Sequence, residues 1–422
     1  MRILYVSQYF PPEMGAPGAR VSELSRHWVR AGHEVTVLTG FPNHPTGVVP
    51  PNYRGKLRRL VLREQYDGIN VVRTWLWPLP NRKTHERLLN YASFCLSACV
   101  TGLFVRRPDV VIATSPQLLV GLSGWWLAKW KRVPFVFEVR DLWPESLNAV
   151  GVKGERSLLY QSLAVVSNFL YRACSRLVVV TPAFKEHIAE RNRISRERIS
   201  IVLNGVETAL FSPRPDTAPV LAELGLQGRF VVSYIGTMGN AHGLETVLQA
   251  AAALREAHPE IAFLLVGEGA EKERLGEMAR SRALGNLTIL DQQPRGKIPA
   301  LVSASDVCLV LLKDTEIFKT VIPTKMLEFM SCARPVILGV EGEARAILEA
   351  AGGGICIHPE ATDELVSAIL LLAGNPELRS AMGARGRDYI ASNLSRENLA
   401  HDYLGILQDL ITARAAGVTA AQ

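Results

Sequence analysis

The chain contains 422 residues, of which 48% are hydrophobic and 21% are charged. These proportions are close to globular averages and exclude a globally disordered, collagen-like or coiled-coil protein. At about 150 residues per domain, the length predicts two large domains or three smaller ones. The six cysteines include no C-x-x-C pair. We therefore expect reduced thiols in a cytosolic protein rather than a disulfide framework or a zinc site.

The net charge of +7 is unevenly distributed along the chain. Residues 1–180 hold 23 Lys and Arg against 11 Asp and Glu, whereas the remainder holds 24 against 29. A basic N-terminal part favours an anionic partner, which could be nucleic acid, phospholipid or a phosphorylated substrate. No zinc-finger, helix-turn-helix or RNP-like pattern is present, so we expect no nucleic-acid partner.

Two features of the sequence bear on its location. The first apolar run, Ile3–Val6, is too short for the core of a secretory signal. No apolar stretch reaches the roughly 18 residues that a membrane-spanning helix requires. We therefore expect a cytoplasmic protein.

Short apolar runs rich in β-branched residues alternate with helical patterns through the first half of the chain. The predicted strands are Arg2–Val6, Glu34–Leu38, Asn70–Arg73, Val110–Ala113, Phe135–Val139, Leu177–Val180 and Ser200–Val202. Stretches such as Arg20–Ala31 and Ala183–Arg191 have helical spacing. Nearly continuous apolar strands separated by helices are typical of a parallel sheet covered on both faces.

The same pattern begins again in the second half. Its predicted strands are Phe230–Ile235, Ala262–Val266, Leu287–Leu290, Val307–Leu311, Pro335–Gly339 and Gly354–Ile357. Asn204–Asp216 contains Gly and Pro and is predicted to be the linker. We therefore expect an α/β protein with two doubly wound domains, 1–212 and 213–392, and a binding cleft between them. A last helix, about Ser395–Arg414, and a fraying tail would occupy 393–422.

Two glycine-containing loops each follow a strand and precede a helix. The first runs through Gly15 and Gly18, and the second runs through Gly236, Met238 and Gly239. Such loops can be ordinary turns, or their backbone N–H groups can bind a phosphate with help from the helix dipole. One loop in each domain predicts that a diphosphate is held between them.

A third turn, at Gly267 and Gly269, also follows a strand. It can be a simple turn, or its glycines can allow close packing against a bound nucleotide.

The segment Thr320–Ile337 combines three polar residues with an apolar helical pattern. Thr324 is predicted to cap the helix after Pro323, and Lys325 near the helix start can neutralise a phosphate. Glu328 can accept two hydrogen bonds from a ribose diol. The alternative is a solvated helix face, which the apolar surroundings disfavour.

Several residues of the N-terminal domain are candidates for catalysis and for acceptor binding. Asp141 follows a predicted buried strand and can take a proton from an acceptor hydroxyl or hold it, although a loop contact or helix cap is equally compatible. Glu145 is a second catalytic candidate. Glu13 is a third candidate, and we assign it, with Arg140 and His44, to acceptor binding. His44 can equally be an ordinary loop residue.

The segment Asn90–Val105 is an apolar helical pattern with basic residues on both sides. The flanking residues are Arg82, Lys83, Arg87, Arg106 and Arg107, and five tryptophans, at 75, 77, 125, 126 and 130, lie in the same half. Apolar, basic and tryptophan side chains together are typical of a surface that rests on anionic lipid. A buried crossover helix is the alternative interpretation.

With these motifs, the chain resembles a family-4 glycosyltransferase of the GT-B fold, and within that group the WbuB-type fucosamine transferases of O-antigen and capsule assembly. The resemblance covers nearly the whole chain, including Thr39–Gly47, Arg140–Ser146, Asn204–Glu207, Pro323–Pro335 and Ala351–Ile355. It implies two facing Rossmann-like domains, the second binding the donor and the first the acceptor, with the last helix packing back onto the first.

The resemblance also implies a function. The chain would be a retaining enzyme that transfers a sugar, in our reading an N-acetylated deoxyhexosamine, from a UDP-sugar to a polyprenyl-diphosphate-linked saccharide at the inner face of the membrane. Glu328 would bind the ribose, but Thr320 stands where many relatives have a further glutamate. Lys325 would replace a missing basic pair after the second loop. We expect no metal cofactor, since no D-x-D occurs. A nucleotide-sugar epimerase and a non-enzymatic membrane scaffold are the alternatives.

Overall fold

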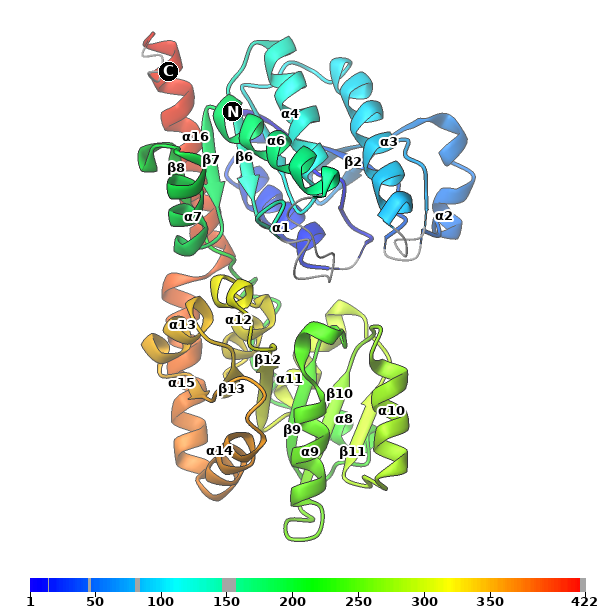
Figure 1. Ribbon diagram of the computed structural model, residues 1–422, viewed down its shortest axis with the longest axis vertical. Helices are drawn as coiled ribbons and strands as arrows, with labels where there is room; N and C mark the ends of the chain where they lie inside the picture. Colours follow the sequence, from blue (N-terminus) through cyan, green and yellow to red (C-terminus); the bar gives the residue numbers. More distant parts are fainter. Residues whose placement is uncertain (14, 45–46, 80–83, 146–156, 418–422) are drawn as a thin grey trace. The chain divides into compact units, whose positions relative to one another are not determined.

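The computed structural model describes residues 1–13, 15–44, 47–79, 84–145 and 157–417. The chain divides into two compact units (Figure 1). Unit 1 contains Met1–Leu203 and Glu397–Gln422, and unit 2 contains Asn204–Arg396. The division follows Leu203, directly before the segment that the sequence predicts as the linker. Each unit is described by itself below.

Unit 1 is built on an eight-stranded sheet with the order β3-β4-β2-β1-β5-β6-β7-β8. The strands are β1 (Arg2–Val6), β2 (Glu34–Gly40), β3 (Val61–Tyr66), β4 (Ile69–Thr74), β5 (Val110–Thr114), β6 (Phe135–Val139), β7 (Arg176–Val179) and β8 (Ile199–Ile201). Seven of them are parallel, which confirms the interpretation of the apolar runs.

Strand β3 is absent from the sequence prediction. It pairs antiparallel with β4 at the edge of the sheet, and its sequence, VLREQY, is largely polar. An edge strand with one solvated face lacks the continuous apolar run by which the buried strands were recognised. This hairpin also makes the sheet mixed rather than wholly parallel.

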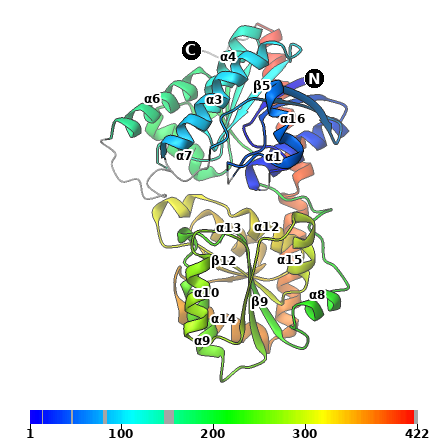
Figure 2. The same ribbon diagram turned by 90° about the vertical axis from the view of Figure 1, so that its right-hand side faces the viewer.

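Helices cover both faces of this sheet (Figure 2). They are α1 (Ala16–Arg30), α2 (Pro51–Arg54), η1 (Leu57–Arg59), α3 (Thr84–Leu103), α4 (Leu118–Lys131), α6 (Leu158–Ala173), α7 (Pro182–Asn192), η2 (Arg196–Arg198) and α16 (Arg396–Ala415). One core cluster joins α3, α4, α6 and α7 to the sheet, and another joins α1 and α16 to the opposite face. The last helix returns to unit 1, where Trp28 Nε1 donates to Ala400 O at 2.9 Å.

A buried ion pair lies between α1 and the sheet. Arg20 Nε donates to Glu138 Oε1 at 2.9 Å, and Tyr5 Oη donates to Glu138 Oε2 at 2.7 Å. Burial raises the pKa of Glu138, but the charges of Arg20 and Arg140 outweigh burial and leave it lowered. Arg20 also donates to the carbonyls of Val202 and Leu203. These contacts connect the first helix to the segment directly after β8.

Unit 2 contains a six-stranded parallel sheet with the order β11-β10-β9-β12-β13-β14. The strands are β9 (Phe230–Ile235), β10 (Ile261–Val266), β11 (Leu287–Leu290), β12 (Val307–Leu311), β13 (Val336–Gly339) and β14 (Gly354–Cys356). All six match predicted strands within one or two residues. Their buried side chains are almost all apolar, as a sheet covered on both faces requires.

The helices of unit 2 complete its layers. They are α8 (Ala218–Glu223), η3 (Asn240–His242), α9 (Glu245–Leu254), α10 (Lys272–Ser281), η4 (Arg295–Lys297), α11 (Ile298–Ser303), η5 (Glu316–Thr320), α12 (Thr324–Ser331), α13 (Glu343–Ala351), α14 (Thr362–Gly374) and α15 (Pro376–Asn393). Helices α9, α10 and α14 share one core cluster with the strands. Across the described ranges of both units, no helix combines the length and apolar character that crossing a bilayer requires.

Candidate active site

The first glycine loop of unit 1 lies between β1 and α1. Gly15 is the N-cap residue of α1, with a φ of +136° that favours glycine. No side chain caps the helix there, and its first turn carries no acidic residue. A Cβ on Gly18 would lie 3.4 Å from the carbonyl oxygen of Glu13. This uncapped helix end is compatible with an anion, and the anion site at this loop stays a prediction.

Glu13 ties this loop to the loop that follows β2. Its Oε1 accepts hydrogen bonds from the backbone N–H groups of Asn43 (2.8 Å) and His44 (2.9 Å). Burial raises the pKa of Glu13 to about 7, although those two hydrogen bonds act in the opposite direction. Glu13 therefore holds the His44 loop in place and can exchange a proton near neutral pH.

His44 packs against an aromatic ring of the first loop. Its ring centroid lies 4.7 Å from that of Tyr9. Burial lowers the pKa of His44. The imidazole is therefore mainly neutral at pH 7. A neutral ring suits the wall of an acceptor pocket better than a protonated one would.

Arg140 and Asp141 follow β6 at the carboxyl edge of the sheet, as predicted. Their backbone N–H groups both donate to Ser115 Oγ, at 2.7 and 3.3 Å, which ties them to the loop after β5. Arg140 also donates to the carbonyl of Pro17 at 3.2 Å. Burial raises the pKa of Asp141 to about 6, and the charge of Arg140 opposes this rise. Asp141 is therefore ionised at pH 7 and is a stronger base than an ordinary aspartate.

Glu145 has a different environment from Asp141. Its Oε1 lies 3.2 Å from Arg191 Nη1 and 3.5 Å from His187 Nε2 on α7. Burial raises the pKa of Glu145, but the hydrogen bond to His187 and the charge of Arg191 outweigh it and leave the pKa lowered. Glu145 is thus a weaker proton acceptor than Asp141. Other parts of the predicted motifs, Met14, Pro45, Thr46 and Ser146, lie outside the described residues.

In unit 2, the loops after β9 and β10 cross in backbone contact. Gly236 has a φ of +155°. A Cβ on Gly267 would lie only 1.9 Å from the carbonyl oxygen of Gly236. A Cβ on Gly269 would lie 2.3 Å from the carbonyl oxygen of Met238. Gly267 and Gly269 therefore serve the packing of the two loops, and any contact with a nucleotide would come in addition.

Met238 does not fit the role that the sequence analysis assigns to it. Its side chain is fully buried in the core of unit 2, and its N–H donates to Glu268 O at 2.8 Å. The apolar Met238 side chain packs into the core because the chain turns inward at this residue. Met238 thus supports the loop, while Gly236 and Gly239 lie on either side of it.

Helix α12 begins at Thr324, the residue that the sequence analysis predicts to be its N-cap. Pro323 is the N-cap residue, and no side chain caps the helix. Thr324 is already the first helical residue, so the predicted capping by its hydroxyl is wrong. The side chain of its neighbour Lys325 extends to the end of β9, where Nζ donates to Tyr234 Oη at 2.8 Å.

The ammonium group of Lys325 lies in a confined place. Nζ is 4.1 Å from the centroid of the Tyr234 ring, and Tyr234 Oη donates to Thr237 O at 2.6 Å. Burial lowers the pKa of Lys325 to about 7, and the charge of Glu328 opposes this shift. The arrangement holds a titratable amine against the second glycine loop, where an incoming anion would favour its charged form.

Glu328 lies on the second turn of α12, and its side chain is 12% exposed. Its Oε1 is 3.2 Å from Arg295 Nη1, and the Arg295 guanidinium lies 5.1 Å from the ring centroid of Phe211. The sequence analysis missed Arg295. Arg295 follows β11 and so lies at the carboxyl edge of the sheet, as the start of α12 does. This position could have identified it as a candidate site residue from the sequence.

His242 is a second residue that the sequence analysis left without a role. Its ring centroid lies 6.0 Å from that of Tyr234. Burial and the charge of Lys325 lower the pKa of His242 to about 4. A neutral imidazole thus lies beside the amine at the second glycine loop.

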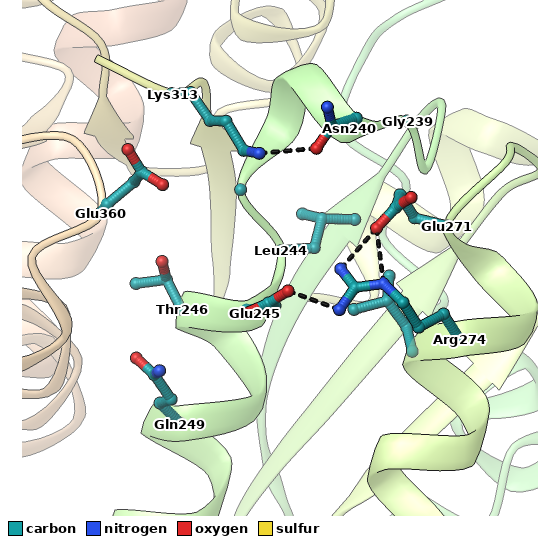
Figure 3. A pocket seen from close by; sticks show the side chains of 12 residues that line it. Gly239, Asn240, Leu244, Glu245, Thr246, Gln249, Glu271, Arg274, Lys313 and Glu360 are labelled. Carbon is teal, nitrogen blue, oxygen red and sulfur yellow. Dashed lines mark hydrogen bonds and ion pairs between the residues drawn. The ribbon is translucent and has the colours of Figure 1, made fainter.

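A separate cavity of about 180 Å³ opens between α9 and α10 (Figure 3). Its lining residues are Gly239, Asn240, Gly243, Leu244, Glu245, Thr246, Gln249, Glu271, Arg274, Leu275, Lys313 and Glu360. Arg274 pairs with Glu245 and Glu271, and Lys313 Nζ donates to Asn240 Oδ1 at 2.6 Å. Of the predicted site residues, only Gly239 lines this cavity, so it is distinct from the Lys325 region.

Among the residues that the structure describes, no group of three or more His, Cys, Asp or Glu side chains is arranged to hold a metal ion.

Comparison with known families covers most of the chain. Residues 15–205 match the model described as a glycosyl transferase 4-like domain, and residues 221–389 match the model described as glycosyl transferases group 1. The two matches fall in unit 1 and unit 2, with residues 204 and 205 of the first match extending past the division. Each unit therefore corresponds to one family domain.

Similar proteins cover the whole length as well. The chain is 25% identical over 414 residues to WcaI of Escherichia coli (strain K12), named as a glycosyl transferase of colanic acid biosynthesis, covering 96% of this chain and 99% of WcaI. Sucrose-phosphate synthase from Thermosynechococcus elongatus has a similar structure, with a TM-score of 0.76 at 19% identity over 98% of this chain and 99% of that one. HepE from Anabaena, in complex with UDP-glucose, gives 0.70 at 17% identity, over 97% and 100%. With a family domain in each unit and this fold, the chain belongs to the family-4 glycosyltransferases of the GT-B fold.

Proposed function

We propose that this glycosyltransferase is a retaining enzyme of bacterial surface polysaccharide synthesis. It transfers a sugar, an N-acetylated deoxyhexosamine in our proposal, from a UDP-sugar to a polyprenyl-diphosphate-linked saccharide. Within family 4 we place it with the WbuB-type transferases. WcaI, whose name refers to colanic acid biosynthesis, and HepE, whose structure holds UDP-glucose, support the pathway class and the donor class.

The observation that carries the proposal is the position of Lys325 against the second glycine loop. A Cβ on Gly236 would lie 3.0 Å from Lys325 Nζ, so amine and loop backbone face the same small space. A departing diphosphate needs compensating positive charge, which loop N–H groups and an ammonium group supply. Glu328, one turn further along α12, is the group for the ribose hydroxyls.

At the acceptor end, Asp141 is the proposed proton acceptor. The acceptor oxygen forms its bond to the anomeric carbon on the face from which UDP leaves, and its proton passes to Asp141. The electron pair of the broken carbon–oxygen bond leaves with the β-phosphate. With a pKa of about 6, Asp141 is ionised at neutral pH and is matched to this step. Glu13, His44 and Arg140 belong to acceptor binding in this proposal.

The transfer requires no metal ion in this proposal, since Lys325 and the loop amides stabilise the leaving group. The reaction takes place in the cytoplasm at the inner face of the membrane, where a polyprenyl-linked acceptor is anchored. A chelator such as EDTA is therefore expected to leave the rate unchanged.

The test is an assay of UDP release with a panel of UDP-sugars and lipid-linked acceptors. We expect UDP release only when donor and acceptor are both present, with Lys325→Met and Asp141→Asn as inactive controls. Isothermal titration with UDP gives an independent measure of donor binding. Conversion of the donor to an epimer without acceptor would instead identify an epimerase, and absence of UDP binding would contradict the proposal.

A further inference from the structure

Most of the large apolar side chains that are exposed in the described part of the chain lie on one layer of unit 1. Helix α4 packs between α3 and α6 in this layer (Figure 1). The exposed residues include Leu96, Val100 and Phe104 along α3 and its end, Trp126 and Trp130 on α4, and Val165 and Phe169 on α6. We call these seven residues the α3–α4–α6 face.

The seven residues form one stripe on each helix. Within each stripe they are four residues apart, so each stripe follows one side of its helix. Other sides of the same helices are buried against the sheet, through residues such as Phe94, Leu127 and Leu170. The stripes therefore point away from the sheet, and Phe104 and Trp130 are 75% and 63% exposed.

Cross-helix contacts keep the stripes together. The Trp125 and Phe169 rings lie 4.9 Å apart between α4 and α6. Lys131 Nζ donates to Leu103 O (3.1 Å) and Val105 O (2.7 Å), which joins the C-terminal ends of α3 and α4. Phe104 and Trp130 thus lie at the same end of the layer.

The exposed charge at this end is mainly basic, and the nearby acidic residue Glu34 lies 3.5 Å from Arg106. Lys129, Arg106, Arg107 and Arg132 are exposed there, and Arg107 Nε donates to Lys131 O at 3.0 Å. The sequences of α4 and α6 contain no acidic residue, and α3 contains only Glu86. Exposed aromatic and aliphatic side chains bordered by Lys and Arg are complementary to an anionic bilayer surface.

We propose that the α3–α4–α6 face is the surface by which the protein docks on an anionic phospholipid leaflet. This deepens the proposed function, which rests on a membrane-anchored acceptor, by naming the docking surface. A second copy of the chain is a poorer occupant, because symmetric pairing would bring the same basic residues of the two copies together. An anionic leaflet offers an apolar interior for the exposed side chains and negative charge for the basic residues, without repulsion between like charges.

The full-length protein is tested by co-sedimentation with vesicles of phosphatidylcholine, with and without phosphatidylglycerol. We expect binding only to the vesicles that contain phosphatidylglycerol, weakened by added salt. The double variant Phe104→Ser/Trp130→Ser should weaken vesicle binding at least about tenfold, since it removes two of the largest inserting side chains. Leu371→Ser, an exposed apolar residue of α14 in unit 2, is the matched control and should bind as the wild type.

A charge variant tests whether the basic residues at the border of the α3–α4–α6 face contribute to docking. Lys129→Glu should weaken binding about tenfold, whereas Lys185→Glu on α7 should have little effect. UDP titration should give the same affinity in all these variants. This control separates a loss of vesicle binding from a loss of donor binding. Equal binding of wild type and double variant would overturn the proposal. So would a dimer, seen by light scattering without lipid, that Phe104→Ser/Trp130→Ser dissociates.

Discussion

Gly236 and Lys325 approach so closely that a methyl group on the glycine would lie 3.0 Å from the ammonium nitrogen. The glycine follows β9 and the lysine lies in the first turn of α12, so two separate segments of unit 2 meet at one point. At Gly236 the φ of +155° also disfavours any side chain. Gly236→Ala should therefore lower UDP affinity at least about tenfold, which costs roughly 1.4 kcal/mol or more, in isothermal titration. Gly276→Ala, in the middle of α10, where a Cβ would make only an ordinary contact of 3.6 Å with Arg280 Nη1, is the control and should leave UDP affinity unchanged.

Donor binding should depend on pH through Lys325. Its pKa of about 7 means that much of the free protein carries a neutral amine above that pH, whereas a bound diphosphate favours the ammonium form. UDP affinity should therefore be full below pH 7 and fall as pH rises above it, by up to about tenfold per unit. Titrations in buffers of different ionisation enthalpy should show proton uptake at pH 8. Lys325→Met should bind weakly at every pH and lose this proton uptake; uptake that persists would assign it elsewhere.

Glu328→Gln tests the ribose contact. If the carboxylate accepts two hydrogen bonds from the ribose diol, the substitution should cost about 1–2 kcal/mol of UDP binding free energy. The same substitution should cost less with 2′-deoxy-UDP, which lacks one of the hydroxyls. An equal loss with both ligands would show that Glu328 acts only through its ion pair with Arg295.

Asp141→Asn and Glu145→Gln separate the two catalytic candidates. Asp141→Asn should lower kcat by about 10²–10⁴-fold with little change in donor KM, because a proton acceptor is lost. Glu145 is already paired with Arg191, so Glu145→Gln should leave most of kcat in place. In the wild type, kcat/KM should fall as pH drops below 6, since protonated Asp141 cannot take a proton. A wild-type rate in Asp141→Asn would exclude this role.

The buried pair of Arg20 and Glu138 should contribute strongly to stability. Glu138→Gln leaves the guanidinium without its charge partner and should lower the free energy of unfolding by about 3–5 kcal/mol in urea. Since the pKa of Glu138 is lowered, its contribution is present at neutral pH and is lost as the pH falls into the acid range. The variant should show a shallower acid dependence than the wild type. Glu186→Gln, at an exposed ion pair with Arg196, is the control and should unfold at the same urea concentration.

Much of the fold was predictable because its strands are buried on both faces. Runs such as Phe135–Val139 and Phe230–Ile235 are apolar at nearly every position, and both are strands with the predicted bounds. The polar edge strand Val61–Tyr66 was missed because its pairing with β4 arises from a local hairpin rather than from burial. The cap at Thr324 was wrong by one residue: Pro323 itself is the N-cap residue, although proline is favoured at the first helical position and threonine at the cap.

The candidate site was predictable only in part. Glycines between a strand and a helix mark the loops, and a charged residue in an apolar helix marks Lys325 and Glu328. The partners of these residues come from distant segments. Tyr234 reaches α12 from β9 and Arg295 from the 3-10 turn after β11, and His187 and Arg191 reach Glu145 from α7.

The sequence alone determined the parallel strands of the two sheets, the glycine loops and the family, because these depend on local periodicity, turn chemistry and motifs that are contiguous in the chain. Only the tertiary structure decided the protonation behaviour of Glu13, Asp141 and Lys325, and the different environments of Asp141 and Glu145. A pKa depends on burial and on charges within a few ångströms. Those neighbours are brought together by the packing of strands and helices that lie far apart in the sequence.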